Sequence, residues 1–266
     1  MDAPIGVFDS GLGGLTVLRE IEDALPSEDL IYVGDTARVP YGIKSPETVT
    51  RYSKEICDFL VQKGVKAIVV ACNTSSALAL ETLRPMYSLP LLGVLEPGAQ
   101  AAVDATKSQA IGVIGTEGTI KSQGYAHAIR QRLPQAKVVG RACPLFVPLV
   151  EEGWARHEVT RQVAEIYLGE WRGNGIDTLI LGCTHYPVLR GLIQEVLPGV
   201  TLVDSARETA KALQALLAEK GLLGKGEKRG TRRFFTTDAP QKLTELAARF
   251  LGHELGPVEM TNLGAD

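Results

Sequence analysis

Two cysteines each follow a short apolar run, and small polar residues follow each of them. Residues 67–71 read Ala-Ile-Val-Val-Ala before Cys72, and residues 178–182 read Thr-Leu-Ile-Leu-Gly before Cys183. Short apolar runs of this kind are typical of strands buried on both faces of a parallel sheet. Open α/β sheets bind ligands beyond the carboxyl ends of their strands. We therefore expect both thiols to lie at the edge of a binding site.

Two thiols that face each other across a bound carbon acid could invert its configuration. One cysteine, as a thiolate, would remove a proton from the carbon, and the other, as a thiol, would return a proton to the opposite face. The obstacle is acidity, because an ordinary thiol has a pKa of about 8.5 and an amino-acid α-proton is far less acidic. The carbanion must therefore be stabilised by fixed charges and dipoles in a site that excludes water. Such a reaction needs no cofactor.

Three ionisable residues are candidates for accepting protons from the two thiols or donating protons to them. Asp9, at the end of the first apolar run, could serve Cys72. His185, together with Glu151, could serve Cys183. Each candidate also has a structural interpretation. Asp9 could cap a helix, His185 could be a packed imidazole, and Glu151 could be a surface acid.

Three other interpretations of the thiols remain open. They could be buried structural groups, although the polar residues beside them favour exposure. They could bind zinc together with His185, although no CxxC or HxxxH spacing supports such a site. Cys183 could also be a nucleophile with His185 as its base, as in a thiol hydrolase. That last mechanism gives Cys72 no catalytic role.

Two glycine-containing turns follow apolar runs and could approach a ligand closely. Residues 9–14 read Asp-Ser-Gly-Leu-Gly-Gly, but a dinucleotide fingerprint would also need a glycine at the position of Thr16. Residues 115–119 read Gly-Thr-Glu-Gly-Thr and lack the Lys-Ser/Thr pair of a P-loop. We therefore expect no site of either type.

The loop 34–42 is polar but contains a Pro-Tyr-Gly turn, so we expect it to be ordered and to cover a pocket.

The pattern of the first hundred or so residues occurs twice. Residues 110–115 resemble residues 4–9 in form about 106 positions later, and Cys183 follows Cys72 by 111 positions. The nearly equal offsets predict an internal duplication. We expect two pseudo-symmetric α/β domains with mostly parallel sheets that face each other across a cleft. The expected bounds are 1–96 for the first domain, 97–205 for the second, and 206–266 for a segment that returns to complete the first.

Hydrophobic periodicity predicts the individual elements. Strands are expected at 5–8, 30–33, 67–71, 91–94, 110–115, 137–139, 178–182, 201–203 and 234–237, and helices at 15–24, 45–63, 75–83, 158–172, 188–196, 205–219 and 241–251. Residues 96–98, Glu-Pro-Gly, are expected to mark a boundary. Ser205 as N-cap and Glu208 three residues later predict a capping box, with Asp204 as a turn residue.

Composition argues against several functional classes. The 266 residues carry a net charge of −3, so no general basic field would recruit nucleic acid or anionic lipid. No apolar stretch approaches the roughly 18 residues of a membrane span, and the N-terminus lacks the basic region of a signal peptide. Four scattered cysteines do not form a disulfide framework, which favours a cytoplasmic location. Of these, Cys57 and Cys143 are expected to be packed thiols.

One segment departs from this acidic balance. Its basic residues are Lys225, Lys228, Arg229, Arg232 and Arg233. They could form an anion-binding patch, or they could lie on a solvated hairpin loop.

Four motifs, in this order, resemble those of the glutamate racemases within the aspartate/glutamate racemase family. They are residues 8–14 (Phe-Asp-Ser-Gly-Leu-Gly-Gly), 34–42 (Gly-Asp followed by Pro-Tyr-Gly), 71–75 (Ala-Cys-Asn-Thr-Ser) and 181–187 (Leu-Gly-Cys-Thr-His-Tyr-Pro). The resemblance runs nearly end to end and is weaker across the basic segment and the C-terminal residues. It implies an enzyme that uses no cofactor and interconverts L- and D-glutamate for bacterial peptidoglycan.

The resemblance also implies a role for each motif residue. Cys72 would be the base toward D-glutamate and Cys183 the base toward L-glutamate. Asp9 would assist the first thiol, and Glu151 with His185 would assist the second. The implied substrate-binding residues are Asp9, Ser10, Tyr41, Gly42, Asn73, Thr74, Thr116, Thr119, Thr184 and His185. The resemblance implies no metal, and because dimers are usual in the family, we expect a homodimer.

Other functions stay open at this point. The chain could act on aspartate or another acidic amino acid, or it could be a related decarboxylase, although a decarboxylase would keep only one of the two thiols. It could also be a two-lobed sensor that binds an acidic ligand without turnover. Members of the family sometimes restrain DNA gyrase or respond to a muropeptide precursor, and the sequence decides neither property.

Overall fold

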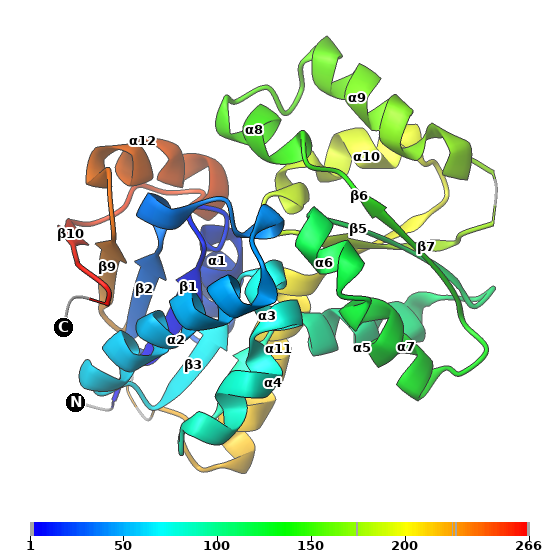
Figure 1. Cartoon of the computed structure of the whole chain (residues 1–266). Helices are drawn as coiled ribbons and strands as arrows, with labels where there is room; N and C mark the ends of the chain where they lie inside the picture. Colours follow the sequence, from blue (N-terminus) through cyan, green and yellow to red (C-terminus); the bar gives the residue numbers. More distant parts are fainter. Residues whose placement is uncertain (1–2, 174, 225, 227, 265–266) are drawn as a thin grey trace.

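The chain forms two lobes, each built around a parallel sheet (Figure 1). The computed structural model describes residues 3–173, 175–224, 226 and 228–264. Among these residues the first sheet has six strands in the order β10-β9-β2-β1-β3-β4, and the second has four in the order β6-β5-β7-β8. Every pairing between the described strands is parallel. The predicted fold class is confirmed, while the predicted domain bounds at 96/97 and 205/206 stay a prediction.

The first lobe contains both ends of the described chain. Its strands are β1 (Ile5–Asp9), β2 (Leu30–Gly34), β3 (Ala67–Val70), β4 (Leu91–Gly93), β9 (Arg232–Thr236) and β10 (Val258–Met260). Its helices are α1 (Leu15–Ala24), α2 (Pro46–Gln62), α3 (Asn73–Leu78), α4 (Leu80–Leu83) and α12 (Pro240–Leu251), with 3₁₀ turns η1 (Thr36–Arg38), η2 (Tyr41–Ile43) and η3 (Arg84–Met86). Strand β9 pairs with β2, so residues late in the sequence complete this sheet.

The second lobe is formed by the middle of the chain. Its strands are β5 (Ala110–Gly115), β6 (Lys137–Ala142), β7 (Thr178–Gly182) and β8 (Thr201–Asp204). Its helices are α5 (Leu95–Ala105), α6 (Glu117–Lys121), α7 (Gly124–Arg132), α8 (Phe146–Glu151), α9 (Glu158–Leu168) and α10 (Arg190–Val196), with 3₁₀ turns η4 (Gly169–Trp171) and η5 (Tyr186–Leu189). Helix α11 (Ser205–Glu219) packs against α1 of the first lobe and α5 of the second.

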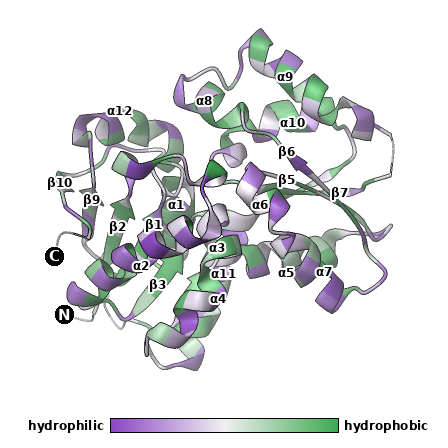
Figure 2. Cartoon of the chain, in the orientation of Figure 1, coloured by the Kyte–Doolittle hydropathy of each residue, from purple (hydrophilic) through white to green (hydrophobic). Residues whose placement is uncertain are grey.

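Strand and helix identity follow from the patterning of apolar residues. All five residues of β1 and of β7 are buried, as expected for central strands covered on both faces. Helix α1 buries Leu15, Leu18 and Ile21, which recur at the helical spacing, and α2 begins with Ser45 as N-cap and Pro46 in its first turn. Figure 2 shows hydrophobic residues along β1, β2 and β3 and mixed colouring along the helices.

Residues 96–98 lie in the first turns of α5, where a proline is tolerated, and the boundary expected at them stays a prediction. Two other local predictions are corrected. Asp204, not Ser205, is the N-cap of α11, since its carboxylate accepts the N–H of Ala206 at 2.9 Å. The single helix predicted at 75–83 is two helices, because Cys72 caps α3 and Ala79 interrupts the helix.

The basic segment also differs from expectation. It leads into β9, which is parallel to both of its neighbours, so it is part of a crossover connection and not a hairpin. Arg232 Nε donates to Glu22 Oε1 at 2.8 Å, and Arg233 Nη2 lies 2.9 Å from Glu259 Oε1. Lys225 lies outside the described residues. The two strand arginines thus face carboxylates of this same chain.

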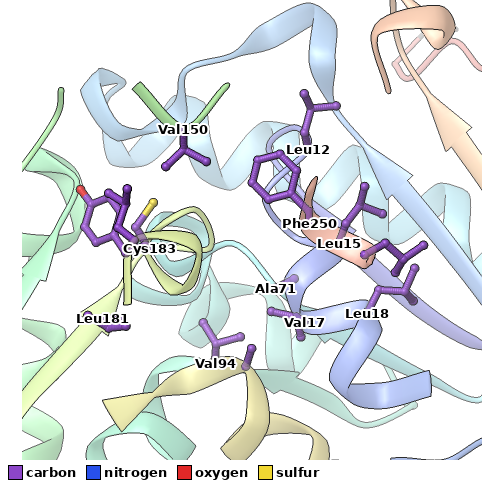
Figure 3. Close-up of a cluster of buried hydrophobic side chains, with 14 of the residues drawn as sticks. Leu12, Leu15, Val17, Leu18, Ala71, Val94, Val150, Leu181, Cys183 and Phe250 are labelled. Carbon is purple, nitrogen blue, oxygen red and sulfur yellow. The ribbon is translucent and has the colours of Figure 1, made fainter. Parts of the chain in front are cut away.

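One hydrophobic cluster joins the two lobes beneath the cleft (Figure 3). It includes Leu15 and Leu18 from α1, Phe250 from α12, and Leu181 from β7. Val94, at the crossing from the first lobe to the second, is fully buried within it. Burial of contiguous apolar surface favours one relative placement of the lobes.

A buried ion pair connects three separate segments of the first lobe. Lys66 Nζ lies 2.5 Å from Glu28 Oε2, and both side chains are nearly inaccessible to solvent. The other carboxylate oxygen of Glu28 accepts the N–H of Gly224 at 2.6 Å. The glutamate therefore links the turn before β2, the residue before β3, and the segment that leads toward β9.

We expect Lys66→Met to lower the free energy of unfolding by about 3 to 5 kcal/mol, because it leaves a buried carboxylate without its cation. Urea denaturation followed by circular dichroism measures the change. The matched control is Lys54→Met, which removes an exposed partner of Asp58 at 2.6 Å and should leave stability nearly unchanged. Equal losses in the two variants would contradict the assignment of the Lys66 pair as a buried structural contact.

Candidate active site

Both thiols line one cavity of about 320 Å³ between the lobes. The predicted site residues that line it are Ser10, Tyr41, Gly42, Cys72, Asn73, Thr74, Thr116, Glu151, Cys183, Thr184 and His185. Asp9 and Thr119 do not line it, but both are buried beside residues that do. A larger depression of about 780 Å³ between α1 and α11 holds neither thiol. Most of the candidate site residues therefore line the smaller cavity.

Cys72 lies immediately after β3 and caps helix α3. Its Sγ accepts the N–H of Ser75 at 3.5 Å, and its thiol donates to Ser10 Oγ at 3.6 Å. Burial and the nearby Asp9 carboxylate raise the pKa of the thiol to about 11, against the opposing effect of the hydrogen bonds with Ser75 and Ser10. Cys72 therefore carries its proton at neutral pH when the cavity is empty.

Asp9 ends β1 behind the Cys72 side of the cavity. Its Oδ2 accepts the N–H of Gly11 at 3.0 Å, and its Oδ1 has no hydrogen-bond partner within the described part of the chain. Burial raises the pKa of this carboxyl, although His185 and nearby backbone amides oppose the shift. The helix-cap interpretation is wrong, because the N-cap position of α1 is Gly14. Asp9 is a buried acid with a free acceptor oxygen.

The ionisable group beside Cys183 is a cationic histidine, whereas the group beside Cys72 is a carboxyl group. His185 Nδ1 lies 4.0 Å from Cys183 Sγ, and His185 Nε2 lies 3.1 Å from Glu151 Oε1. Burial disfavours the imidazolium, but the hydrogen bonds to Cys183 and Glu151 outweigh burial and raise the His185 pKa to about 10. The same hydrogen bond is the main reason that the Glu151 pKa falls below its usual value. A protonated imidazole beside Cys183 can stabilise a thiolate at this position by its charge.

The two lobes approach each other closely at the glycine turn after β1. A Cβ atom on Gly13 would lie 2.3 Å from Thr184 Oγ1 and 2.5 Å from His185 Nδ1. Thr16, three residues further on, donates its hydroxyl to the backbone oxygen of Thr184 at 3.0 Å. Glycine is thus required at position 13 because a second-lobe loop occupies the space that a side chain would fill.

A triangle of threonine hydroxyls spans the cleft on its other side. Thr74 Oγ1 lies 2.9 Å from Thr116 Oγ1, which in turn lies 3.0 Å from Thr119 Oγ1. Thr74 belongs to the first lobe and the other two belong to the second. Gly42 also approaches here, since its added Cβ would lie 2.6 Å from Thr116 Cβ. The predicted threonines therefore sit together, with hydroxyls that can reorient toward a ligand.

Tyr125 was not predicted, yet it contacts residues adjacent to both thiols. Its hydroxyl donates to Asn73 Oδ1 at 2.6 Å, which leaves Asn73 Nδ2 without a partner among the described residues. Its ring lies against Gly182, where an added Cβ would be 3.1 Å from Tyr125 Cε2. Sequence alone gave no signal, because Tyr125 and Asn73 are 52 positions apart and Tyr125 occupies an ordinary buried position of α7.

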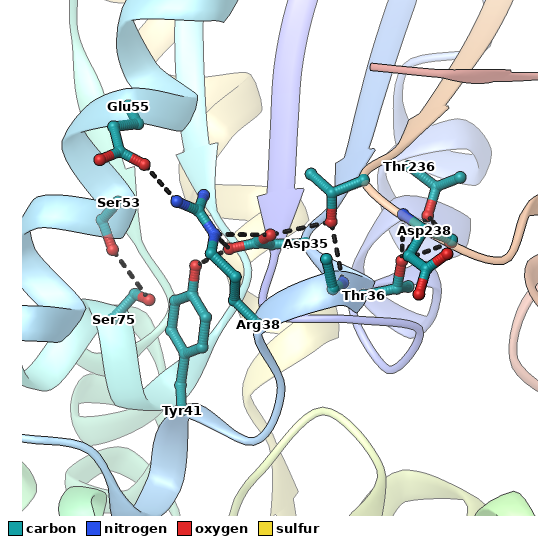
Figure 4. Close-up of polar contacts among 11 residues, drawn as sticks. Asp35, Thr36, Arg38, Tyr41, Ser53, Glu55, Ser75, Thr236 and Asp238 are labelled. Atoms are coloured by element: carbon teal, nitrogen blue, oxygen red, sulfur yellow. Dashed lines mark hydrogen bonds and ion pairs between the residues drawn. The ribbon is translucent and has the colours of Figure 1, made fainter. Parts of the chain in front are cut away.

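Asp35 anchors the loop that carries Tyr41 and Gly42 (Figure 4). Its fully buried carboxylate accepts hydrogen bonds from Arg38 Nε at 2.7 Å, from Thr237 Oγ1 at 2.9 Å and from the Tyr41 hydroxyl. The Tyr41 hydroxyl is therefore engaged by Asp35. The loop can therefore contact a substrate through its backbone and not through the Tyr41 phenol.

The zinc alternative lacks a ligand set. Within the described residues, no three or more His, Cys, Asp or Glu side chains are placed to hold one metal ion. No helix among them is long and apolar enough to cross a membrane.

The chain is similar to glutamate racemases in both sequence and structure. A glutamate racemase from Geobacter metallireducens is 55% identical over 98% of this chain and 97% of its own. The solved structure of a glutamate racemase from Bacillus anthracis is 42% identical and matches with a TM-score of 0.95 over 99% of both chains. That of a Francisella tularensis glutamate racemase in complex with D-glutamate is 38% identical, with a TM-score of 0.93 over 99% of this chain and 98% of its own.

The family model described as Asp/Glu/Hydantoin racemase matches residues 5–213, which include both thiols and every element that carries them to the cavity. The chain therefore belongs to the Asp/Glu/hydantoin racemase family and is an isomerase of the amino-acid racemase class.

Proposed function

We propose that this racemase interconverts L- and D-glutamate without a cofactor, and that Cys72 and Cys183 are its two acid/base groups. The observation that carries the proposal is the presence of two thiols in one cavity, each at a strand end and each beside a different buried ionisable group. Two-base inversion needs this arrangement, whereas a binding protein has no need of matched thiols. The similarity to glutamate racemases supports glutamate as the substrate.

The cavity has groups that suit an acidic amino acid. Asn73 Nδ2 is a buried donor with no partner in the described structure, and a substrate carboxylate would satisfy it. Asp9 Oδ1 is a buried acceptor that also has no partner in the described structure. Hydroxyls of Ser10, Thr74 and Thr184 add neutral hydrogen-bonding groups around the cavity. The described residues that line it include no lysine or arginine, so carboxylate binding rests on neutral donors and on the cationic His185.

The proposed reaction from L-glutamate begins with a thiolate at Cys183, which the adjacent imidazolium of His185 stabilises. This thiolate removes the α-proton and becomes a thiol. Cys72, which carries its proton because its pKa is about 11, then donates that proton to the opposite face. One proton is gained at Cys183 and one is lost at Cys72, so the total is unchanged.

The reverse reaction starts from the opposite proton distribution. Cys72 must now be the thiolate, and Asp9 beside it has a raised pKa and a free oxygen, so it can accept and hold the proton that Cys72 releases. Cys183 must be a thiol, and His185 can supply that proton.

We further propose that the D-glutamate serves peptidoglycan synthesis and that the enzyme is a homodimer, as the family resemblance implies. Sedimentation of the purified protein measures its oligomeric state.

We expect the purified protein, without added cofactor, to abolish the optical activity of L-glutamate in deuterium oxide and to place deuterium at the α-carbon. Circular dichroism and mass spectrometry follow the two signals. Cys72→Ser and Cys183→Ser should each lower the racemisation rate by about 10² to 10⁴-fold, the usual contribution of a positioned acid or base. The control Cys57→Ala removes a buried thiol outside the cavity and should remain active. An inert protein with glutamate but active with aspartate would reassign the substrate, and full activity in either serine variant would rule out the two-thiol mechanism.

We expect His185 to remain protonated through neutral pH and to lose its proton near pH 10, because its pKa is raised well above the ordinary histidine pKa of about 6.5. Because the folded state binds this proton more tightly than the unfolded state, the stability that the proton contributes is fully present below about pH 6.5 and is lost as the pH rises through about 10. Nitrogen NMR of the imidazole measures the titration. Glu151→Gln should move the midpoint to lower pH, because it removes the carboxylate charge that stabilises the imidazolium. A wild-type midpoint near 6.5 would contradict the proposed imidazolium.

We expect Tyr125→Phe to raise the KM for glutamate by about 2- to 10-fold, because the loss of one hydrogen bond of about 0.5 to 1.5 kcal/mol frees the Asn73 amide to rotate away from the substrate. Steady-state kinetics measure the change in both directions. The control Tyr87→Phe removes a phenol that donates to Asp58 at 2.7 Å, outside the cavity, and should leave KM unchanged. An unchanged KM in Tyr125→Phe would show that the tyrosine does not orient the amide.

A further inference from the structure

Helix α12 belongs to the first lobe, yet it contacts both members of the Glu151–His185 pair in the second lobe. The ring of Phe250 is fully buried (Figure 3) and meets the His185 imidazole edge to face, with ring centroids 5.2 Å apart and planes at 81°. The preceding residue, Arg249, donates from Nη1 to the backbone oxygen of Glu151. Arg19 of α1 donates to the backbone oxygen of Phe250 at 3.4 Å and so connects this turn of α12 to the first lobe. Two consecutive residues of one helix thus touch the pair.

The end of α8 leaves room for the Arg249 guanidinium. Glu151 is the last residue of α8, and Gly153, two residues further on, has a φ of +80°, a conformation that glycine adopts without strain. An added Cβ on Gly153 would lie 2.9 Å from Arg249 Cζ and 3.0 Å from Arg249 Nη2. The last carbonyl groups of a helix have no partner within the helix, and an arginine side chain can bond to them. The guanidinium therefore holds the backbone of α8 at the residue that carries the carboxylate.

The position of the Glu151 backbone determines where its carboxylate can reach. Glu151 Oε1 lies 3.1 Å from His185 Nε2, and a side chain of two methylene groups joins this carboxylate to the backbone that Arg249 holds. Glu151 Oε2 lies 3.7 Å from Lys242 Nζ, but that amine is mostly exposed, so we expect it to contribute little. Phe250 covers the imidazole, so the bond between carboxylate and imidazole forms away from bulk water, where it is stronger.

The charged groups around the imidazole show how Arg249 acts on it. Cys183 and Glu151 hydrogen-bond to His185 and favour its protonated form, and Asp9, from β1, favours the same form by its charge. Within the described residues, no hydrogen bond or ion pair joins the guanidinium to the Glu151 carboxylate or to His185; its bond is to the Glu151 backbone. Any effect of Arg249 on the imidazole therefore passes through the placement of Glu151.

We propose that Arg249 is a positioning residue that keeps the two members of this pair in contact, so that the ionisable group beside Cys183 is completed by a helix of the opposite lobe. The inference rests on the proposed role of His185 and adds the residue that prepares it. Because α12 reaches the pair from the first lobe, the contact exists only while the lobes keep this placement. The protonation of the group beside Cys183 is thereby linked to the closure of the cleft.

The test follows the titration of His185 by nitrogen NMR and requires no turnover. We expect Arg249→Ala to lower the midpoint by about 0.5 to 1 pH unit, the amount that one hydrogen bond contributes, because the carboxylate is no longer held against the imidazolium. Arg249→Lys, which keeps a cationic donor, should lower it less. In a Glu151→Gln background Arg249→Ala should cause no further shift, since its effect passes through that carboxylate.

The matched control is Arg161→Ala. Arg161 is an exposed arginine of α9 that pairs with Glu195 and does not line the cavity, so its loss removes the same charge from the protein without touching the pair. A loss of stability alone would leave the midpoint of the folded protein unchanged. An unchanged midpoint in Arg249→Ala, an equal shift in Arg161→Ala, or a full shift in the Glu151→Gln background would overturn the positioning role.

The same assay separates this inference from the proposed function. A protein that shows these shifts but does not racemise glutamate would keep the positioning role of Arg249 and lose the proposed function. A protein that racemises glutamate but shows no shift in Arg249→Ala would keep the function and lose the positioning role.

Discussion

The close contact between the glycine turn after β1 and the loop after β7 determines what the cleft can do. Each sheet brings one thiol to the carboxyl end of its strands, but a single carbon can lie between two thiols only if those ends approach each other. The absence of a side chain at Gly13 permits the approach, and the bond from Thr16 to the Thr184 backbone maintains it. The shared hydrophobic cluster beneath the cleft supports the same placement.

The near-symmetry of the two halves does not extend to their charges. Cys72 lies near a buried carboxylate and neutral hydroxyls, while Cys183 lies near an imidazolium that is itself paired with Glu151. A symmetric environment would give both thiols the same proton affinity. The two-base reaction that we propose needs one thiol with a proton and one without when the substrate arrives, and the two thiols have neighbours of opposite charge.

The sequence was informative where a signal is local. Apolar runs that end in Cys72 and Cys183 predicted the strands, their parallel arrangement and the meeting of the two thiols. It was uninformative where a partner is distant. Nothing local links Tyr125 to Asn73 or Thr237 to Asp35, which are 52 and 202 positions apart. Helix ends were misplaced where two adjacent residues could each cap, as at Asp204 and Ser205, and β10 was missed because it is short and largely exposed.

The position of β9 has a consequence for the order in which the cavity can be assembled. Asp35 holds the Tyr41 loop, yet one of its partners, Thr237, follows a strand that enters the first sheet only after the whole second lobe has been made. During synthesis the N-terminal part of the chain therefore emerges long before the residues that complete its sheet. The second lobe has its own sheet and needs no such later residue for its strand pairings. The half of the protein that is translated first is thus the half that is finished last, and its unpaired β2 edge must stay available until then.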